Sequence, residues 1–383
     1  MIFNVENTDA GGRAGILNTA HGAVKTPVFM PVGTQGAVKA VSHRDLDGIG
    51  VQIILANAYH LYLRPGSDVI TGAGGLHSFS GWDKPFLTDS GGFQIYSLSK
   101  LRKVDEDGVT FQSHLDGSSH RFTPESAIRI QRSIGPDIMM VLDECVPYPC
   151  DESYAARSNR RTLDWADRSL AEYAGTSPLY GFEQALFGII QGSVYPDIRR
   201  ESTRALVGMG FGGYAIGGLA VGEPNGMMYD TIEICANEIP GDRPRYLMGV
   251  GTPANLLEAI ERGVDMFDCV LPTRNARNAT LFTREGSLTI TNARHAREHV
   301  PVDASCACYC CGNFTRAYLR HLFNVREILG PALATIHNLW FYHRLVAEAR
   351  ERIVGGTFGT WKAGILKELD QGEPLPAADA VVH

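Results

Sequence analysis

The sequence predicts an α/β protein with the fold of a (β/α)8 barrel, or TIM barrel, and a small cysteine-rich subdomain near its C-terminus. Eight short apolar runs recur along the 383 residues, with helical patterns between them. Continuous apolar runs of this length are typical of strands buried on both faces, as in a parallel sheet. Half of the eight cysteines lie in one hexapeptide, CACYCC (306–311). An open, doubly wound sheet is the alternative, because it alternates strands and helices in the same way.

The expected strands end in glycine or polar residues. In chain order they are VFMPVG (28–33), IILAN (53–57), FLTDSGG (86–92), DIMMVLDE (137–144), ALFGIIQG (185–192), GYAIGG (213–218), RYLMGVG (245–251) and MFDCVLPT (266–273). Helix signals lie between them. After the third strand, Thr123 offers an N-cap with Pro124 at the first helical position, and Gly135 with Pro136 ends that helix.

Two insertions interrupt the alternation. The stretch 103–122, rich in Gly, Asp and His, is predicted as a hairpin insertion after the third strand, and 280–290 alternates like a hairpin after the eighth. We therefore predict a single barrel domain over residues 1–383, with the cysteine-rich subdomain over 280–340 inserted before the last helix.

The last helix is expected to end at the glycine pair 355–356. Its apolar residues recur at three- and four-residue spacing: Leu339, Tyr342, Val346, Ala349 and Ile353. The tail 372–383 is expected to fray.

Composition narrows the class of protein. No apolar stretch approaches the roughly 18 residues of a membrane span, and the first fifteen residues lack the basic and apolar regions of a signal peptide. We expect a cytoplasmic protein without membrane contact. The net charge is −7, but residues 270–356 carry eleven arginines against six Asp and Glu, a local charge of +5. This asymmetry indicates either an anionic partner or a solvated basic face.

The cysteine cluster is typical of a metal site. Cys306, Cys308 and Cys311 supply three thiolates in a C-x-C-x₂-C pattern, and zinc needs a fourth ligand, for which His337 is the candidate. Such a closed shell makes one zinc per subunit structural. Other interpretations stay open: a redox pair of Cys308 and Cys311, free thiols, or Cys310 as ligand in place of Cys306 or Cys311.

Functional groups of this fold lie at the C-terminal ends of the strands. There the sequence offers carboxylate, amide and hydroxyl groups, namely Asp89, Ser90, Asp143, Glu144, Gln191 and Asp268. A charge inside an apolar strand is costly unless it is paired or used. Two carboxylates across one pocket suggest glycosyl chemistry, in which one attacks the anomeric carbon and the other handles the proton. Asp268 and Asp89 are the candidates for these two roles. Arg274 and Arg277 lie just after Asp268 and could bind phosphates or bases, or pair with acidic neighbours.

Ordered motifs over nearly the whole chain resemble the bacterial tRNA-guanine transglycosylases (queuine tRNA-ribosyltransferases). The motifs are TPVFMPVGT, RPG, LTDSGGFQ, DECVPYP, FGIIQGSV, GGLAVGE, YLMGVGTP, MFDCVLPTRNAR, the cysteine set and IHNL. This resemblance implies a TIM barrel with a zinc subdomain, working as a homodimer. It also implies exchange of the wobble guanine in tRNAs for Asp, Asn, His and Tyr, with a deazaguanine inserted.

The resemblance implies a role for each matching residue. Asp268 is the nucleophile that forms a covalent tRNA–enzyme intermediate, and Asp89 is the acid/base that deprotonates the incoming base. Phe93 and Met248 are expected to sandwich the purine. The remaining base-binding residues are Ser90, Gly91, Gly92, Asp143, Gln191, Gly218 and Leu219. The residues expected to contact the tRNA anticodon stem-loop are Gly249, Val250, Gly251, Thr252, Pro253, Ala254, Asn255, Thr273, Arg274, Asn275, Ala276 and Arg277.

The chain departs from the family pattern at Ala58, where GNTYH is usual and ANAYH (56–60) stands here. Val221 in GGLAVGE matches the bacterial pattern, and a branched side chain there fills the space of queuine's cyclopentenediol. The resemblance therefore implies 7-aminomethyl-7-deazaguanine as the inserted base. A non-catalytic relative is disfavoured because Asp89 and Asp268 are both present. A relative acting on DNA or on the tRNA D-loop is disfavoured by GGLAVGE and by the absence of an added RNA-binding domain.

Overall fold

A computed structural model of the chain describes residues 2–98 and 102–371. Its centre is a parallel sheet of eight strands in the order β4-β14-β13-β12-β11-β10-β6-β5. These strands are β4 (Val28–Met30), β5 (Ile54–Asn57), β6 (Phe86–Asp89), β10 (Ile138–Met140), β11 (Ala185–Ile190), β12 (Gly213–Ile216), β13 (Arg245–Leu247) and β14 (Met266–Asp268). Each lies within one of the eight predicted runs, so the strand prediction is confirmed.

The two end strands of this sheet approach each other. Val32, just after β4, forms a parallel bridge with Leu55 of β5. The Leu55 N–H donates to the Pro31 carbonyl at 3.1 Å, and the Gly33 N–H donates to the Leu55 carbonyl at 2.7 Å. The sheet is therefore a nearly closed barrel, which confirms the predicted fold and excludes the open sheet.

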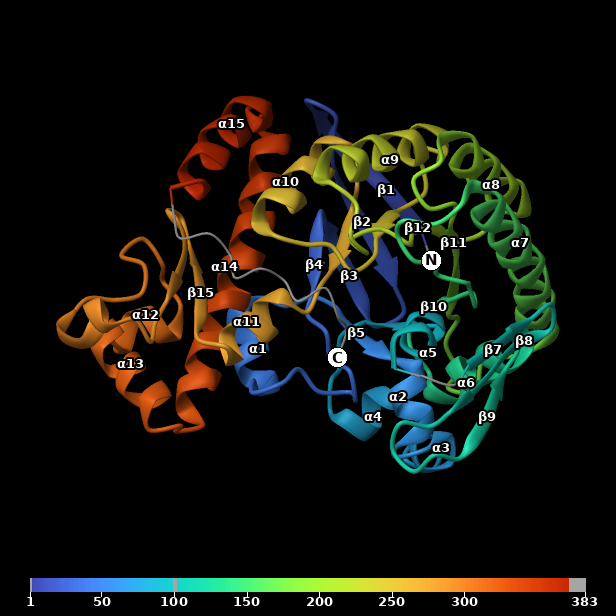
Figure 1. Cartoon of the computed structure of the whole chain (residues 1–383), viewed down its shortest axis with the longest axis horizontal. Helices are drawn as coiled ribbons and strands as arrows, with labels where there is room; N and C mark the ends of the chain where they lie inside the picture. The colour runs from blue at the N-terminus through green and yellow to red at the C-terminus, as the bar shows by residue number, and fades with distance from the viewer. Residues whose placement is uncertain (1, 99–101, 372–383) are drawn as a thin grey trace.

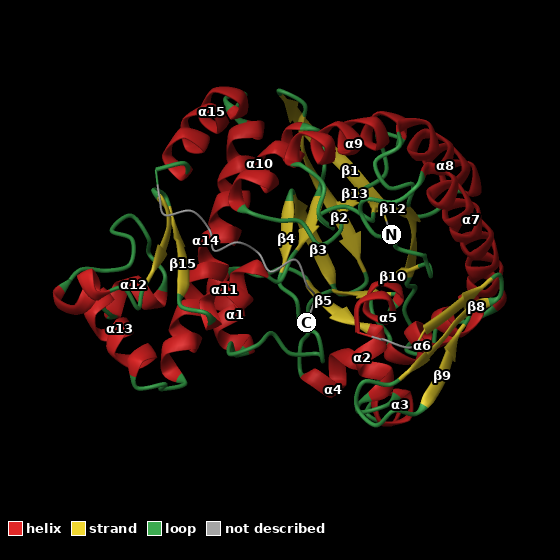
Figure 2. Cartoon of the chain, viewed as in Figure 1, coloured by secondary structure: helices red, strands yellow, loops and turns green. Residues whose placement is uncertain are grey.

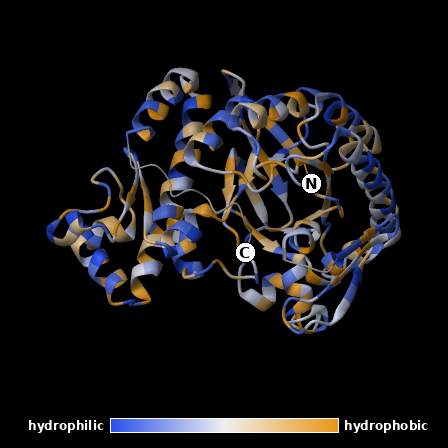
Figure 3. Ribbon diagram, in the orientation of Figure 1, coloured by the Kyte–Doolittle hydropathy of each residue, from blue (hydrophilic) through white to orange (hydrophobic). Residues whose placement is uncertain are grey.

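Helices surround the barrel (Figures 1 and 2). The main ones are α1 (His43–Ile49), α6 (Pro124–Ile134), α7 (Glu152–Gly175), α8 (Pro196–Met209), α9 (Asn225–Glu238), α10 (Pro253–Glu261) and α14 (Leu329–Val354). The helix α6 has the predicted N-cap Thr123 and C-cap Gly135. Hydropathy follows this arrangement: the helices alternate between apolar and polar residues in Figure 3, and the apolar side packs on the buried strands. No helix among the described residues combines the length and the apolar character that crossing a membrane requires.

Shorter elements fill the loops. They are α2 (Ala58–Leu63), α3 (Ser67–Gly72), α4 (Leu76–Ser80), α5 (Gly92–Leu98) and α11 (Leu271–Arg277). The predicted insertion after the third barrel strand is a sheet of three antiparallel strands, β7 (Arg102–Asp105), β8 (Gly108–Gln112) and β9 (Ser119–Phe122). The hairpin prediction there is confirmed, with one more strand than expected.

The C-terminal part forms a subdomain with its own small apolar core. Its elements are β15 (Thr280–Thr283), β16 (Gly286–Thr289), the 3-10 helix η1 (Ala293–Arg297), α12 (Tyr309–Asn313) and α13 (Arg316–Asn324). The pair β15–β16 is the predicted second hairpin. The long helix α14 contacts both this subdomain and the barrel strand β4, and in Figure 1 it lies between them. The boundaries 280–340 and the single-domain assignment stay predictions.

A helix beyond the expected last one corrects the sequence analysis. The helix α14 ends at Val354 as predicted, but α15 (Phe358–Leu369) follows it. Phe358 and Ile365 are buried in the main core, and Lys362 forms ion pairs with Glu258 and Glu261. The glycine pair was read as the end of helical structure, whereas it is a turn between two helices. The tail 372–383 lies outside the described residues.

The N-terminal segment forms a sheet that the sequence analysis did not predict. Its strands are β1 (Ile2–Asp9), β2 (Gly12–Thr19) and β3 (Gly22–Thr26), all antiparallel. Arg13 on β2 makes two hydrogen bonds, of 3.1 and 2.7 Å, with Asp265, which precedes β14. This contact ties the sheet to the N-terminal ends of the barrel strands, so the functional cavity must be sought at the opposite end.

A second contact at this end involves two histidines and one buried carboxylate. His21 Nδ1 lies 2.9 Å from Asp137 Oδ1, and His77 Nε2 lies 3.1 Å from Oδ2. The three residues resemble a metal-ligand set. However, the two rings stack with centroids 3.6 Å apart and planes inclined by 15°. A metal lies in the plane of each imidazole that binds it, so two stacked rings cannot share one ion.

We expect Asp137 to make the stability of the protein sensitive to acid. Burial raises its pKa, but hydrogen bonds from His77, His21 and the Phe86 N–H outweigh this and lower the pKa to about 2. A carboxyl whose folded pKa lies below its ordinary value near 3.9 stabilises the fold above that pH and loses this contribution toward pH 2. Urea unfolding between pH 6 and 2 should therefore show a flatter pH dependence for Asp137→Asn than for the unmodified chain. Equal slopes would contradict the assignment.

Candidate active site

A cavity of about 320 Å³ opens at the C-terminal ends of the barrel strands. Most of the predicted catalytic and base-binding residues line it because each lies at the end of a strand or in the few residues that follow one. Those lining it are Asp89, Ser90, Gly92, Phe93, Asp143, Gln191, Gly218, Leu219, Met248 and Asp268, together with Gly249 and Arg274 from the predicted RNA-binding set. All eight barrel strands thus contribute a residue within or shortly after the strand, counting Val32 after β4 and Leu55 of β5.

Asp268 is the last residue of β14 and is buried. Its Oδ1 accepts hydrogen bonds from the Tyr246 hydroxyl at 2.6 Å and from the Gly249 N–H at 2.8 Å. Burial raises the pKa of Asp268, and these two hydrogen bonds oppose the rise. Its Oδ2 has no hydrogen-bond partner within residues 2–98 and 102–371. One oxygen is therefore held in place and the other is free to react.

Asp89 ends β6 in the same cavity. The Asn57 amide donates to its Oδ2, and the Ala58 N–H donates to its Oδ1 at 3.0 Å. Burial raises the pKa of Asp89 to about 7, the hydrogen bond from Asn57 opposes the rise, and the charge of Asp268 adds to it. A carboxyl with a pKa near neutrality can both accept and donate a proton under physiological conditions.

Asp143 and Gln191 form a polar edge on another wall of the cavity. Gln191 Nε2 donates to Asp143 Oδ2 at 2.7 Å, and the Ser90 hydroxyl lies 3.5 Å from Oδ1. Burial raises the pKa of Asp143 to about 6. Gln191 Oε1 is buried and has no hydrogen-bond partner among the described residues. An unpaired buried acceptor is costly unless a ligand satisfies it, so this edge is suited to a ligand with polar groups along one side.

Glycines keep this edge open. A Cβ on Gly92 would lie 2.7 Å from the Asp143 carbonyl, and one on Gly218 would lie 2.3 Å from Gln191 Oε1. Gly218 also has a φ of +63°, which disfavours other residues. Gly91, by contrast, does not line the cavity; a Cβ there would meet Phe122 and Tyr59.

The apolar part of the cavity includes Phe93 and Met248. Phe93 is 43% exposed although it is a large aromatic residue. An exposed aromatic ring at a cavity mouth offers a flat face to a planar ligand. That the two residues sandwich a purine stays a prediction.

The predicted RNA-binding segments follow the C-terminal ends of β13 and β14, but only two of their residues line the cavity. Gly249 and Arg274 line the cavity, whereas the other ten residues do not. Thr252 and Asn255 form the capping box of α10, and the side chains of Val250 and Ala276 are buried. RNA contact by these segments stays a prediction. The exposed Gly249 and the half-buried Arg274 support it more than the buried side chains do.

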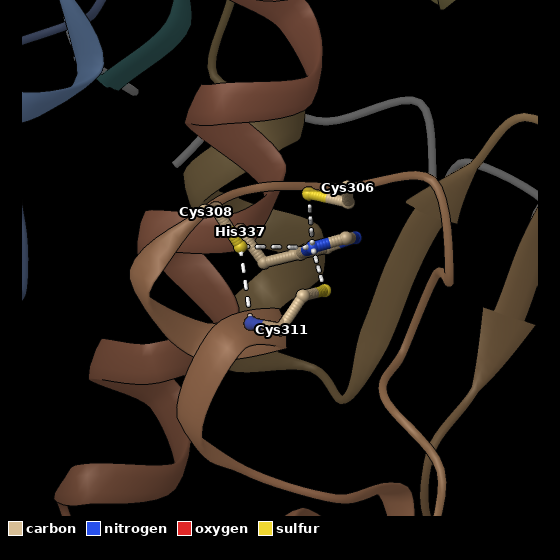
Figure 4. Close-up of side chains that lie close together, drawn as sticks. All are labelled: Cys306, Cys308, Cys311 and His337. Atoms are coloured by element: carbon tan, nitrogen blue, oxygen red, sulfur yellow. Dashed lines mark hydrogen bonds between the residues drawn. The ribbon is translucent and has the colours of Figure 1, made fainter.

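The cysteine cluster folds as a compact group of four ligand atoms. The sulfurs of Cys306, Cys308 and Cys311 lie 3.7, 3.5 and 3.3 Å from His337 Nδ1 (Figure 4). Tetrahedral zinc, with bonds of about 2.3 Å to sulfur and about 2.05 Å to nitrogen, separates these atoms by roughly 3.6 Å. His337 Nε2 lies 2.7 Å from the Phe282 carbonyl, which orients Nδ1 toward the sulfurs. The group can hold a metal ion.

Cys310 lies outside this group of ligand atoms. Its side chain is fully buried in the apolar core of the subdomain. The extra thiol is therefore a core residue, and Cys306 and Cys311 keep the positions expected of ligands.

Comparison with known proteins agrees with this geometry. The family model described as "Queuine tRNA-ribosyltransferase" matches residues 8–371. The chain belongs to the queuine tRNA-ribosyltransferase family. It is an enzyme of the pentosyltransferase class, a tRNA-guanine transglycosylase.

Curated members of the family are similar along nearly their whole length, and each is named queuine tRNA-ribosyltransferase. The protein from Caldanaerobacter subterraneus is 55% identical over 93% of this chain and 94% of its own. That from Thermoanaerobacter pseudethanolicus is 54% identical over 91% and 92%. That from Thiobacillus denitrificans is 53% identical over 95% and 97%. The resemblance seen in the sequence motifs is thus confirmed.

Two residues of the active site, Tyr246 and His60, were missed by the sequence analysis. Tyr246 donates to Asp268, and burial raises its pKa well above the ordinary value, so it stays a donor. His60 lines the cavity, and burial lowers its pKa to about 4, with His114 and Lys39 adding to the effect. The only signal for Tyr246 in the sequence was its position within a buried strand, two residues before Met248.

Proposed function

We propose that this enzyme exchanges the guanine at the wobble position of tRNAs for Asp, Asn, His and Tyr for 7-aminomethyl-7-deazaguanine. The exchange is a double displacement through a covalent tRNA–enzyme intermediate, in queuosine biosynthesis. The observation that carries the proposal is the pair Asp89 and Asp268 in one cavity beside a polar edge, in a member of this family.

In the first step Asp268 Oδ2 attacks C1′ of the target ribose. The bond from C1′ to the base breaks, and guanine leaves with the bonding electrons and takes up a proton from solvent. The hydrogen bonds of Tyr246 and Gly249 to Oδ1 hold the carboxylate for this attack. In the second step the incoming base gives its proton to Asp89 and attacks C1′. The bond from C1′ to Asp268 Oδ2 then breaks, which frees the enzyme, and Asp89 loses the proton to solvent. Two displacements retain the configuration, as in retaining glycosidases.

The polar edge is proposed to read the base before it reacts. Asp143 accepts and Gln191 both accepts and donates hydrogen bonds, so together with Ser90 and the backbone at Gly218 and Leu219 they match the edge of a guanine-like base. The target base must leave the anticodon stack to reach them. Val221 also lines the cavity, consistent with a small substituent on the inserted base.

The test uses an anticodon stem-loop with the sequence UGU and labelled guanine. We expect label to enter the loop, and 7-aminomethyl-7-deazaguanine to displace it far more efficiently than queuine. A matched loop with UAU should take up nothing. Equal use of the two bases would contradict the substrate assignment, and absence of guanine uptake would contradict the function.

We expect Asp89→Ala to remove base exchange and leave tRNA binding nearly unchanged, because the residue handles a proton rather than the RNA. Because the pKa of Asp89 lies at about 7, the carboxylate needed as a base is lost as the pH falls below that value. The kcat/KM of the unmodified enzyme should then fall about tenfold per pH unit below pH 7. An active Asp89→Ala enzyme, or a flat profile between pH 5 and 7, would assign the proton transfer elsewhere.

We expect Arg274→Ala to weaken tRNA binding and to reduce the slope of log affinity against log salt by about one, as loss of a phosphate contact does. Arg274 lines the cavity mouth beside Val270. Arg129→Ala is the control, since Arg129 is exposed on α6 and paired with Glu172. Identical salt slopes for the three proteins would make Arg274 structural.

The metal ion held by Cys306, Cys308, Cys311 and His337 is proposed to be zinc, one per subunit, with a structural role. Four protein ligands leave no open position for a substrate. The group also belongs to the subdomain and not to the cavity that Asp89 and Asp268 line.

The enzyme is further proposed to be a cytoplasmic homodimer. The subdomain and the adjoining start of α14 expose large apolar residues, of which Ile328 is 79% and Val325 57% exposed. Exposed apolar groups of this kind mark protein interfaces. Light scattering of the purified chain, whose mass is 41.7 kDa, measures the oligomeric state directly.

A further inference from the structure

The side chain of Arg199, in the first turn of α8, is fully buried. Buried guanidinium groups normally pair with a carboxylate, because an unpaired buried charge is costly. Arg199 has no ion pair among residues 2–98 and 102–371. Its donors bind main-chain carbonyls instead: Ser193 O at 2.7 Å from Nε, Ile190 O at 2.9 Å from Nη1 and Gly218 O at 3.5 Å from Nη2. These hydrogen bonds fix the position of the main chain at Ile190, Ser193 and Gly218, which borders the active site.

The two short hydrogen bonds hold the residues on either side of Gln191. Ile190 ends β11 and Ser193 lies two residues beyond Gln191. One turn along α8, the Ser202 hydroxyl accepts the Gln191 N–H at 3.2 Å. Side chains of α8 therefore hold the backbone of residues 190–193 at three points.

The segment held in this way has an unfavourable backbone conformation. Gly192 has a φ of +128° and Ser193 a φ of +52°. A non-glycine residue in the left-handed region costs free energy and persists only where its surroundings impose it. A Cβ on Gly192 would also lie 3.2 Å from the backbone nitrogen of Arg199, so glycine lets the helix approach closely. The Arg199 hydrogen bond to the Ser193 carbonyl supplies the constraint.

The third carbonyl joins this segment to the neighbouring strand end. Gly218 follows β12, and a Cβ there would lie 2.3 Å from Gln191 Oε1. Gln191 and Gly218 line the cavity together, and Gln191 Nε2 donates to Asp143. A small shift of either backbone segment would therefore move the polar edge as a unit.

We propose that Arg199 is a positioning residue for base recognition: it holds the ends of β11 and β12 so that Gln191 and Gly218 present their polar groups to the base. The inference rests on the proposed function, which assigns the base to this edge. Arg199 does not line the cavity, so it acts through the backbone that it holds.

The test compares Arg199→Lys and Arg199→Met with the unmodified enzyme in guanine exchange. Misplacement of a binding group by a fraction of an ångström to 1 Å costs up to about a hundredfold. We expect the KM for guanine to rise by about ten- to a hundredfold in Arg199→Met and less in Arg199→Lys, while the KM for tRNA stays within about twofold. Arg204→Met is the control, because Arg204 lies on the same helix and pairs with Glu238 at the surface.

A double-variant comparison separates this role from a general loss of stability. If Arg199 acts through Gln191, then Arg199→Met combined with Gln191→Ala should bind guanine no more weakly than Gln191→Ala alone. Additive effects, or equal rises in both KM values, would overturn the inference. Absence of exchange by the unmodified enzyme would instead overturn the proposed function.

If the Arg199 variants do not fold, Ser202→Ala provides the test. This change removes only the hydroxyl that accepts the Gln191 N–H. A rise in the KM for guanine with an unchanged KM for tRNA would support positioning of Gln191 by α8, and no change in either would overturn it.

Discussion

Replacing Asp268 by Asn is expected to abolish the covalent tRNA–enzyme adduct and to lower guanine exchange by at least about a thousandfold, the scale of losing a nucleophile. An amide is a poor nucleophile, and the groups that hydrogen-bond to Asp268, the Tyr246 hydroxyl and the Gly249 N–H, cannot replace the carboxylate. Tyr246 and Gly249 would still bind the amide oxygen, so tRNA binding should persist. Denaturing gels of enzyme, tRNA and a trapping base measure the adduct.

The control for this change is Asp167→Asn, since Asp167 is exposed on the outer helix α7. It should form adduct at the normal rate. A cross-linked band with Asp268→Asn would assign the nucleophile to another residue, with Asp89 the next candidate in the cavity.

His337→Ala is expected to remove the metal and to unfold the C-terminal subdomain. Structural zinc contributes about 10 kcal/mol or more to the folding of small zinc peptides. The apolar core of the subdomain is small, and it includes the ligand Cys308 and the adjacent thiol Cys310. Zinc content per chain, measured together with thermal unfolding, should show both losses.

Cys310→Ala is the matched control, because it removes an adjacent buried thiol that is outside the ligand group. It should retain one zinc per chain and lose only the packing of a small side chain. Full zinc retention in His337→Ala, or zinc loss in Cys310→Ala, would contradict the ligand assignment.

The barrel could be predicted from sequence because its strands are buried on both faces and read as uninterrupted apolar runs. Strands and helices that are only partly buried have less regular apolar patterns and were harder to predict. Strand β1 alternates only irregularly between buried and exposed residues, and its register slips between Val5 and Asn7. Helix α15 depends on Lys362 pairing with Glu258 and Glu261, which lie a hundred residues away in the chain.

The residues of the candidate site could be named from strand ends and motifs, but their interactions could not. The hydrogen bond from Tyr246 to Asp268 joins two strands, so no spacing in the sequence reveals it. The pKa of Asp89 depends on its burial, and Arg199 acts through carbonyl groups that every residue carries. Such contacts are visible only after the chain has folded.

The most direct test of the proposed mechanism is to map the covalent adduct. The enzyme, an anticodon stem-loop and a trapping base are mixed, digested with protease and nuclease, and analysed by mass spectrometry. The account predicts a single modified peptide in which the ribose is attached to Asp268. Attachment to Asp89 or to any other residue, or an enzyme that exchanges guanine without forming an adduct, would contradict it.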